Sequence, residues 1–497
     1  MQKILECSFV YRFFAALFSW LGAQWRKSRI ISRFLSQSYG NAASENVLLL
    51  RIRLFFHRWL CIIFEKIRLN KLLRGSIFTM PFIWGFATIA LAPILPTMAV
   101  LCLTIINIVT IALAFGCDLE RKPAYSPANK YILLFAFVYL VATLSSITVS
   151  GSLFGGALTT LFILCAIVIQ NSATTRRQLN MLVCALVISG TAVSLYGLYQ
   201  YLFGTFNASG WVDSTMFSGI GVRVYSTLDN PNTLSMYLLL VIPFAGACIL
   251  NAKKILPRIF FIGCLCVMLI CMLLTFARGG WLGLIIAAAI FLVLLDRRFI
   301  LAGIVGIVLL YFMLPDFILD RFLSIGNVSD SSTSYRVSIW LGTIAMLRDY
   351  WFAGIGPGTE AFNKVYPLYS YNTAFSLHSH NLYLQLICDA GVCGILGFFM
   401  ILFAYFRNLC VSVVQSNGYI SRLSSGNSLP AALSQESRAM ETARHSKILQ
   451  IAAISSVIGF LVQSATDHSF YNYRVTLVFW AVIGLGLLAA RRERLAP

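Results

Sequence analysis

The chain has 497 residues, of which 59% are hydrophobic and only 11% are charged, and its formal net charge is +20. A soluble globular domain carries about 25% charged residues, so this composition excludes an ordinary soluble protein. The excess of Lys and Arg does not indicate a nucleic-acid partner either, because these residues flank long apolar runs and concentrate in the N-terminal region.

Residues 1–77 form a basic and aromatic N-terminal region. They contain 13 Lys or Arg and 3 Asp or Glu, which gives +10, half of the net charge of the chain. The basic residues alternate with Phe, Trp, Leu and Ile. This pattern predicts amphipathic helices that lie on an anionic cytoplasmic membrane surface, so membrane lipids are expected partners.

Twelve apolar runs follow, each close to the length of a transmembrane helix. They are continuous and do not alternate with a period of two residues, which favours helices over barrel strands. The predicted spans are 78–95, 97–116, 131–149, 154–171, 180–203, 233–251, 259–276, 280–295, 299–314, 384–406, 448–465 and 474–490. The sequence therefore predicts an all-α, polytopic integral membrane protein, with nine spans over 78–314 and three over 384–490.

Basic residues predict the orientation of these spans. With the N-terminus inside, every predicted cytoplasmic connection receives Lys or Arg, and the basic tail 491–497 is also inside. Two long segments then lie outside, at 204–232 and at 315–383. The second is expected to be a large, partly helical loop. The Ser-, Gly- and Ala-rich segment 407–447 is expected to be a flexible cytoplasmic loop.

Two arginines stand at predicted outer ends of spans. Arg223 precedes the Asn-Pro-Asn sequence that starts the 233–251 span. Helix capping and turn formation explain the Asn and Pro residues there, but neither role explains Arg223. Arg278 lies in a turn of two or three residues between two apolar spans. A cation so close to hydrocarbon is either functional or extends to the lipid headgroups, and both interpretations stay open.

The 315–383 loop contains further candidates. Arg336, Trp340 and Arg348 lie in a stretch that is amphipathic and expected to be helical, and a Gly-Pro-Gly turn follows at 356–358. Loop cations are usually surface charges, so this group alone is a weak signal.

Histidines mark the last predicted outer site. The chain has only five His residues, and two of them, His378 and His380, lie just before the 384–406 span. A single His is more often structural than catalytic. A His followed by Asn381 at the mouth of a span nevertheless favours a functional role, since imidazole changes its charge near neutral pH.

From His380 the sequence reads His-Asn, nine residues, then Gly391-Val-Cys-Gly394. This spacing resembles the H-[NSQ]-X9-G-X-X-[GTY] signature of the family of O-antigen ligases and O-antigen polymerases, which includes protein O-oligosaccharyltransferases. The segment that joins Arg223 to Asn-Pro-Asn, the Ala-Arg-Gly-Gly-Trp turn and the outer loop with Gly-x-Gly-Pro-Gly are similar too, in the same order. The resemblance covers about residues 210–400.

The resemblance implies a metal-independent glycosyltransferase with a GT-C-like helical fold and no cofactor, in the bacterial inner membrane. The donor would be a glycan on undecaprenyl pyrophosphate at the outer, periplasmic face, and the acceptor a hydroxyl of a lipid-linked sugar or of a protein. His380 would be the base, and Arg223 and Arg336 would bind the pyrophosphate, because guanidinium binds phosphate oxygens in bidentate fashion. The candidate substrate-binding residues are Arg278, Trp340, Arg348, His378 and Asn381.

Two alternatives remain at this point. A polysaccharide polymerase of the same family would join lipid-linked repeats to each other. An anion transporter is the alternative from a different class, since many spans and buried arginines are compatible with transport. The chain has no evident inverted repeat, however, and its polar residues are predicted at one face of the membrane rather than at the midplane.

Overall fold

The computed structural model describes residues 47–66, 79–118, 121, 123–204, 222–296, 298–299, 303, 305, 319, 331–424 and 430–491. Within these ranges the chain is helical and contains no β-strand. It divides into two compact units, Met1–Arg58 and Trp59–Pro497. In the N-terminal region, helix α4 (Val47–Lys66) has exposed Phe55 and Phe56, a pattern suited to the predicted membrane surface; the rest of residues 1–77 lies outside the described ranges.

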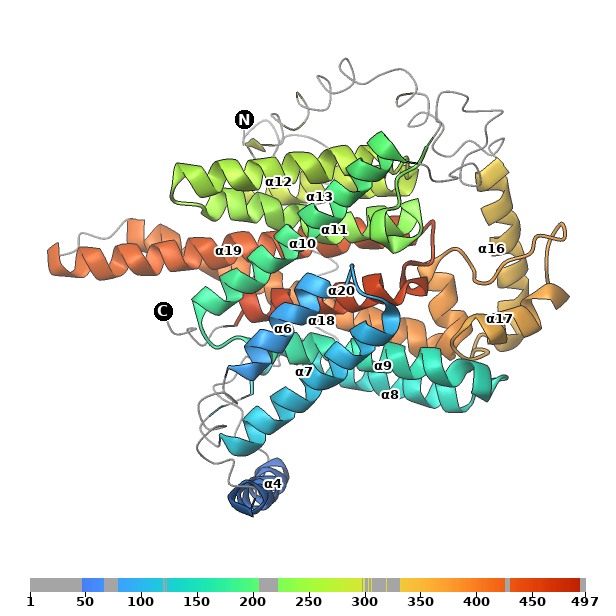
Figure 1. The fold of residues 1–497 in the computed structure, drawn as a ribbon, viewed down its shortest axis with the longest axis horizontal. Coiled ribbons are helices and arrows are strands. Elements are labelled where there is room, and N and C mark those ends of the chain that lie inside the picture. The colour runs from blue at the N-terminus through green and yellow to red at the C-terminus, as the bar shows by residue number, and fades with distance from the viewer. Residues whose placement is uncertain are drawn as a thin grey trace, which may run out of the picture. The chain divides into compact units, whose positions relative to one another are not determined.

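The second unit is a bundle of long helices, drawn in Figure 1. In chain order they are α6 (Met80–Leu91), α7 (Thr97–Cys117), α8 (Pro127–Leu144), α9 (Val149–Ser172), α10 (Arg176–Phe203), α11 (Pro231–Asn251), α12 (Ile255–Leu274), α13 (Arg278–Leu295), α16 (Ser331–Tyr350), α17 (Thr359–Val365), α18 (Leu382–Ser424), α19 (Pro430–Ser464) and α20 (Tyr473–Ala489). Among the described residues, nine helices are long and apolar enough to cross a membrane, and α6 and α20 are shorter apolar helices. The prediction of an all-α, polytopic membrane protein is confirmed. The count of twelve is not, since the predicted span 299–314 lies almost entirely outside the described residues.

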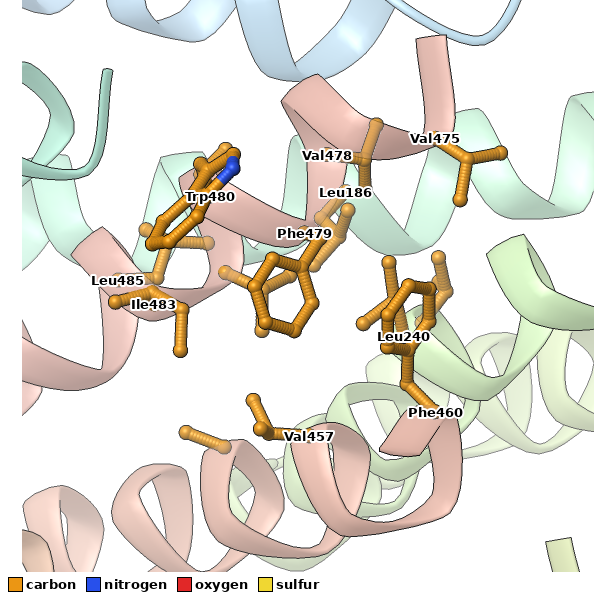
Figure 2. Packing of buried hydrophobic residues seen from close by; sticks show 14 of the residues in the cluster. Leu186, Leu240, Val457, Phe460, Val475, Val478, Phe479, Trp480, Ile483 and Leu485 are labelled. Carbon is orange, nitrogen blue, oxygen red and sulfur yellow. The ribbon is translucent and has the colours of Figure 1, made fainter. Parts of the chain in front are cut away.

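Helix α20 lies at the centre of the bundle. Every residue from Val475 to Ala489 is buried, as expected of a helix that is apolar on all sides. Figure 2 shows Phe479 packed among side chains of α10, α11 and α19, including Leu240 and Phe460. Helices α13 and α19 approach still more closely, because a Cβ on Gly283 would lie 2.6 Å from the carbonyl oxygen of Gly459. Small residues of this kind permit tight helix packing in membranes.

The predicted flexible loop at 407–447 differs from the structure. Helix α18 continues to Ser424 and α19 begins at Pro430, so helix covers nearly all of this segment. Residues 430–447 contain Ala, Gln, Glu, Met, Arg and Lys, which are strong helix formers, and Pro suits the first position of a helix. These helix-forming residues outweigh the Ser and Gly residues on which the prediction of a flexible loop rested.

The predicted outer loop 315–383 contains two of the helices, α16 and α17. Helix α16 buries one face, with Ile339, Thr343, Met346 and Leu347 at helical spacing. These residues belong to a small second core with the buried face of α17, and this core lies at one end of the bundle in Figure 1. The segment is therefore partly helical, as expected, and its position outside the membrane stays a prediction.

Candidate active site

Asp467, in the turn between α19 and α20, connects several polar residues at one end of the bundle. Its Oδ1 lies 3.2 Å from Nδ1 of His380 and accepts the backbone N–H of His468 at 2.9 Å. Its Oδ2 accepts a hydrogen bond from Nδ2 of Asn232 at 3.0 Å and lies 3.8 Å from Nη2 of Arg336. The carboxylate, which follows α19, thus links α11, α16 and the segment just before α18.

The electrostatic environment keeps Asp467 ionised. Burial by itself would raise the pKa of this carboxyl, but the hydrogen bond with His380 and the charge of Arg336 outweigh it and hold the pKa well below its usual range. An ionised carboxylate can only accept hydrogen bonds. The proton in the His380 contact therefore sits on Nδ1 of the imidazole, which leaves Nε2 as the basic nitrogen.

Arg223 joins the same network through Asn232. Arg223 is only 6% exposed; its Nε donates to the carbonyl oxygen of Thr275 at 2.8 Å, and its Nη2 donates to Oδ1 of Asn232 at 3.0 Å. The helix cap is Asn230, whose side chain accepts from the backbone N–H groups of Asn232 and Thr233. The interpretation of both asparagines as cap and turn residues is thus wrong for Asn232, which bridges Arg223 to Asp467.

His380 is held in an uncommon backbone conformation. Its φ is +48°, in the left-handed region that a residue with a Cβ rarely adopts. Trp340 donates from Nε1 to the carbonyl oxygen of His380 at 3.3 Å. Asn381 caps α18 by accepting from two backbone N–H groups, and its Nδ2 donates to the carbonyl oxygen of Ala465 at 2.8 Å. Strained residues persist where the surroundings over-determine them, and such positions cluster at functional sites.

His378 packs against His380, with ring centroids 4.2 Å apart. Its Nδ1 accepts the backbone N–H of His380 at 3.2 Å. Burial, and secondarily the charge of His380, lowers the pKa of His378 to about 3. His378 is therefore neutral at physiological pH and supports the backbone of its neighbour.

The glycines of the signature mark a break in α18. The backbone is not helical at Ala390 and Gly391, and the segment 351–355 inserts there: Val392 N–H donates to the carbonyl oxygen of Trp351, and Ile355 N–H donates to that of Cys388. Gly391 has a φ of +60°, and a Cβ on it would lie 1.9 Å from the carbonyl oxygen of Phe352. Only glycine fits this close approach.

The other predicted site residues lie at different distances from this network. Arg278, at the start of α13, donates from Nη2 to the hydroxyl groups of Ser332 and Thr333 at 2.9 and 3.2 Å, near the start of α16. Arg348 is exposed in the last turn of α16, and twelve residues separate it from Arg336, about 18 Å along the helix. The structure thus brings Arg336 and Arg223 to Asp467 but not Arg348.

A metal ion would face an unfavourable charge at this site. Ligand-type atoms of His378, His380 and Asp467 all lie within 4.8 Å of one another, a spacing that could hold a metal ion. The Arg336 guanidinium, however, lies 3.8 Å from the same carboxylate and opposes a second cation. Asp467 is also already engaged by Asn232, His380 and the backbone of His468. The geometry favours an ion-paired carboxylate over a metal ligand.

Sequence reasoning missed Asp467, His468 and Asn232. The signal for the first two was available, because Asp-His occupies the short connection between the last two predicted spans, at the same outer end as His380. Like Arg278, these two titratable residues lie in a short connection between two apolar spans, which should have made them candidates. Asn232 offered no signal of its own, since capping explained it.

Residues 232–399 match a family model described as O-antigen ligase. The match begins at Asn232 and includes Arg278, Arg336, His380 and the signature glycines, while Arg223 and Asp467 lie outside it. No curated protein matches the chain.

Proposed function

Because residues 232–399 of this multi-pass membrane protein belong to the O-antigen ligase family, we propose that it is a ligase- or polymerase-like glycosyltransferase. The proposed reaction transfers a glycan from undecaprenyl pyrophosphate to an acceptor hydroxyl, at the periplasmic face of the bacterial inner membrane. The observation that carries this proposal is the Asp467 carboxylate, held between the imidazole of His380 and the guanidinium of Arg336. The arrangement offers a base and a cation to the two partners of a glycosyl transfer.

His380 is the proposed general base. Nε2 takes the proton of the acceptor hydroxyl as its oxygen attacks the anomeric carbon of the donor sugar. Asp467 holds the imidazole through Nδ1–H and stabilises the imidazolium that forms, a role familiar from histidine–aspartate pairs in hydrolases. Trp340 binds the carbonyl oxygen of His380 and Asn381 anchors the next residue to Ala465, so both act as positioning residues.

The leaving group needs positive charge. When the new carbon–oxygen bond forms, the bond from the anomeric carbon to the phosphate oxygen breaks, and the electron pair leaves with the lipid pyrophosphate. Arg336 is the proposed main contact of that anion, with Arg223 and Arg278 in support, because preorganised guanidinium groups stabilise developing phosphate charge. In this scheme the arginines take the place that a divalent cation holds in other phosphate sites.

The experiment is transfer in proteoliposomes that contain the purified protein, a lipid-linked donor with a labelled glycan, and lipid A–core oligosaccharide as acceptor. We expect labelled lipid A–core without added divalent metal and in the presence of EDTA. Labelled chains that grow on the carrier lipid instead would identify the polymerase of the same family. Movement of the glycan across the membrane without a new glycosidic bond would refute both and identify a transporter.

The base is tested in the same assay with two variants. His380→Ala should lower the transfer rate by about 10²–10⁴, the usual contribution of a positioned acid–base group. His378→Ala lies two residues away and should be far milder. A fully active His380→Ala protein would refute the assignment, and equal loss from both variants with poor expression would identify a structural role for the histidine pair.

A further inference from the structure

A cavity of about 550 Å³ adjoins His378 and His468 on the side of α9 and α20. Its volume lies within the range of about 300–1,000 Å³ that is typical of small-molecule sites. His378 and His468 form part of its wall, and the ring of His378 contacts that of His380. None of the three arginines proposed to bind the donor lines it. The cavity is therefore next to the proposed base, with the ring of His378 between them, and does not include the proposed pyrophosphate site.

The charges of the cavity wall do not suit an anion. Three carboxyl groups line it, from Asp229, Glu360 and Asp389. Among the described residues Arg474 is the one Lys or Arg on the wall, and it is ion-paired with Asp229. Asp389 is buried and already accepts hydrogen bonds from Tyr139 and Gln385, so Glu360 is the carboxylate whose charge a phosphate or an acidic sugar would meet here. Carboxylates are instead good acceptors for hydroxyl groups, which suits an uncharged polyol.

The wall also offers aromatic surface and a polar atom without a partner. Phe154 and Tyr471 line the cavity and are each 47% exposed, so their rings are available to the C–H faces of a sugar. Nδ1 of His468 is enclosed and has no hydrogen-bond partner among the described residues. Burial lowers the pKa of His468 well below its ordinary value, so the ring is neutral and offers one donor and one acceptor. A hydroxyl group can satisfy either role, and an enclosed polar atom left unpaired is costly.

We infer that this cavity binds the acceptor, and that the acceptor group it takes is an uncharged saccharide whose reactive hydroxyl passes His378 to reach His380. The inference rests on the proposed transferase function and extends it to the acceptor class. The donor pyrophosphate and the acceptor sugar then approach the His380–Asp467 pair from chemically different sides, one rich in arginine and one rich in carboxylate and aromatic groups. A protein serine or threonine is the competing acceptor.

Ser150→Trp tests the cavity with little risk to the fold. Ser150 is exposed in the first turn of α9 and lies on the cavity wall. Its neighbour Val149 is also exposed but does not line the cavity, so Val149→Trp is a matched control. In the proteoliposome assay with a lipid A–core acceptor that ends in an unphosphorylated hexose, Ser150→Trp should raise the acceptor KM about tenfold or more, because the indole fills the site. The donor KM and all constants of Val149→Trp should stay within about twofold of wild type.

Glu360→Gln provides a second measurement that does not depend on a bulky residue. It keeps the shape of the side chain and removes the charge, so the acceptor KM should rise about three- to tenfold with little change in kcat. Unchanged acceptor KM in both variants refutes the inference, as does a rise in the donor KM alone. A serine-containing peptide accepted by the wild type and lost in Ser150→Trp, with saccharide transfer intact, also refutes it. Failure of the wild type to transfer to any acceptor refutes the proposed function instead.

Discussion

Replacing Asp467 by Asn removes a charge from the site while it keeps the shape of the side chain. The amide oxygen can still accept from Asn232 or from the backbone of His468, so the turn between α19 and α20 should hold. What is lost is the attraction between the carboxylate and the imidazolium that forms as the acceptor proton moves to His380. The variant therefore separates the electrostatic role of Asp467 from its structural role.

The size of the effect follows from the geometry. Two unit charges at 3.2 Å attract by about 5 kcal/mol at an effective dielectric constant of about 20. Since about 1.4 kcal/mol corresponds to a factor of ten in rate, the upper limit is a loss of about 10³–10⁴. The two side chains are 26% and 14% exposed, so solvent screens part of this attraction. We expect kcat to fall about 10²–10³-fold and the donor KM to change little.

The assay is single-turnover transfer in proteoliposomes, with melting temperature as the measure of folding. Asp349→Asn is the matched control, because Asp349 is an exposed carboxylate of the outer loop that accepts a hydrogen bond from Tyr369 at 2.5 Å. It should retain wild-type kcat. An Asp467→Asn protein within about threefold of wild-type kcat would refute the role of the carboxylate in the proton transfer.

Arginine chemistry, histidine protonation and membrane topology each give a further test. Arg336→Lys should lose about 10–100-fold in transfer because an ammonium cannot form the bidentate contact, whereas Arg348→Lys should be near wild type in the same assay. Because the folded pKa of His378 is about 3, against an ordinary value near 6.5, the unfolded chain binds an extra proton between these values. Acidification from pH 7 to pH 5 should therefore lower stability by up to about 2 kcal/mol through this group, and His378→Phe should flatten the pH dependence of the melting temperature. Reporter fusions should place residue 340 outside and residue 425 inside; the same side for both would overturn the predicted orientation.

The spans could be predicted because hydrocarbon imposes a simple rule on them. The predicted span 233–251 agrees closely with α11 (Pro231–Asn251), since continuous apolarity suffices to locate a transmembrane helix. The predicted ends of the spans are wrong where helix capping sets the true end of the helix. The predicted span 131–149 is displaced from α8, which begins at Pro127 because the Ser126 side chain accepts the N–H of Ala128 and Pro suits the first turn.

The site could be predicted in part because some of its residues defy local explanation. Local helix capping and turn chemistry do not explain a histidine at a helix mouth or arginines beside hydrocarbon, so the sequence alone indicates them as candidates. Asn232 had a sufficient local explanation as a cap residue, and that explanation concealed its bond to Asp467, which is 235 positions away. Contacts of this kind depend on how α11, α18 and α19 pack, which no local pattern in the sequence reports.

The spacing of the signature has a physical meaning in this fold. Asn381 caps the start of α18, and the helix breaks at Ala390 and Gly391, so residues 382–389 form a helical segment of a little more than two turns. At one end of this segment the cap holds His380 against Asp467, and at the other end the break receives the backbone of residues 351–355. The predicted outer loop also carries Arg336 on α16, so the segment sets the distance between the proposed base and the point where the loop with the proposed cation docks. An insertion or deletion within the nine residues would rotate the break by about 100° per residue relative to the cap, and the loop could then no longer dock while His380 keeps its contact with Asp467.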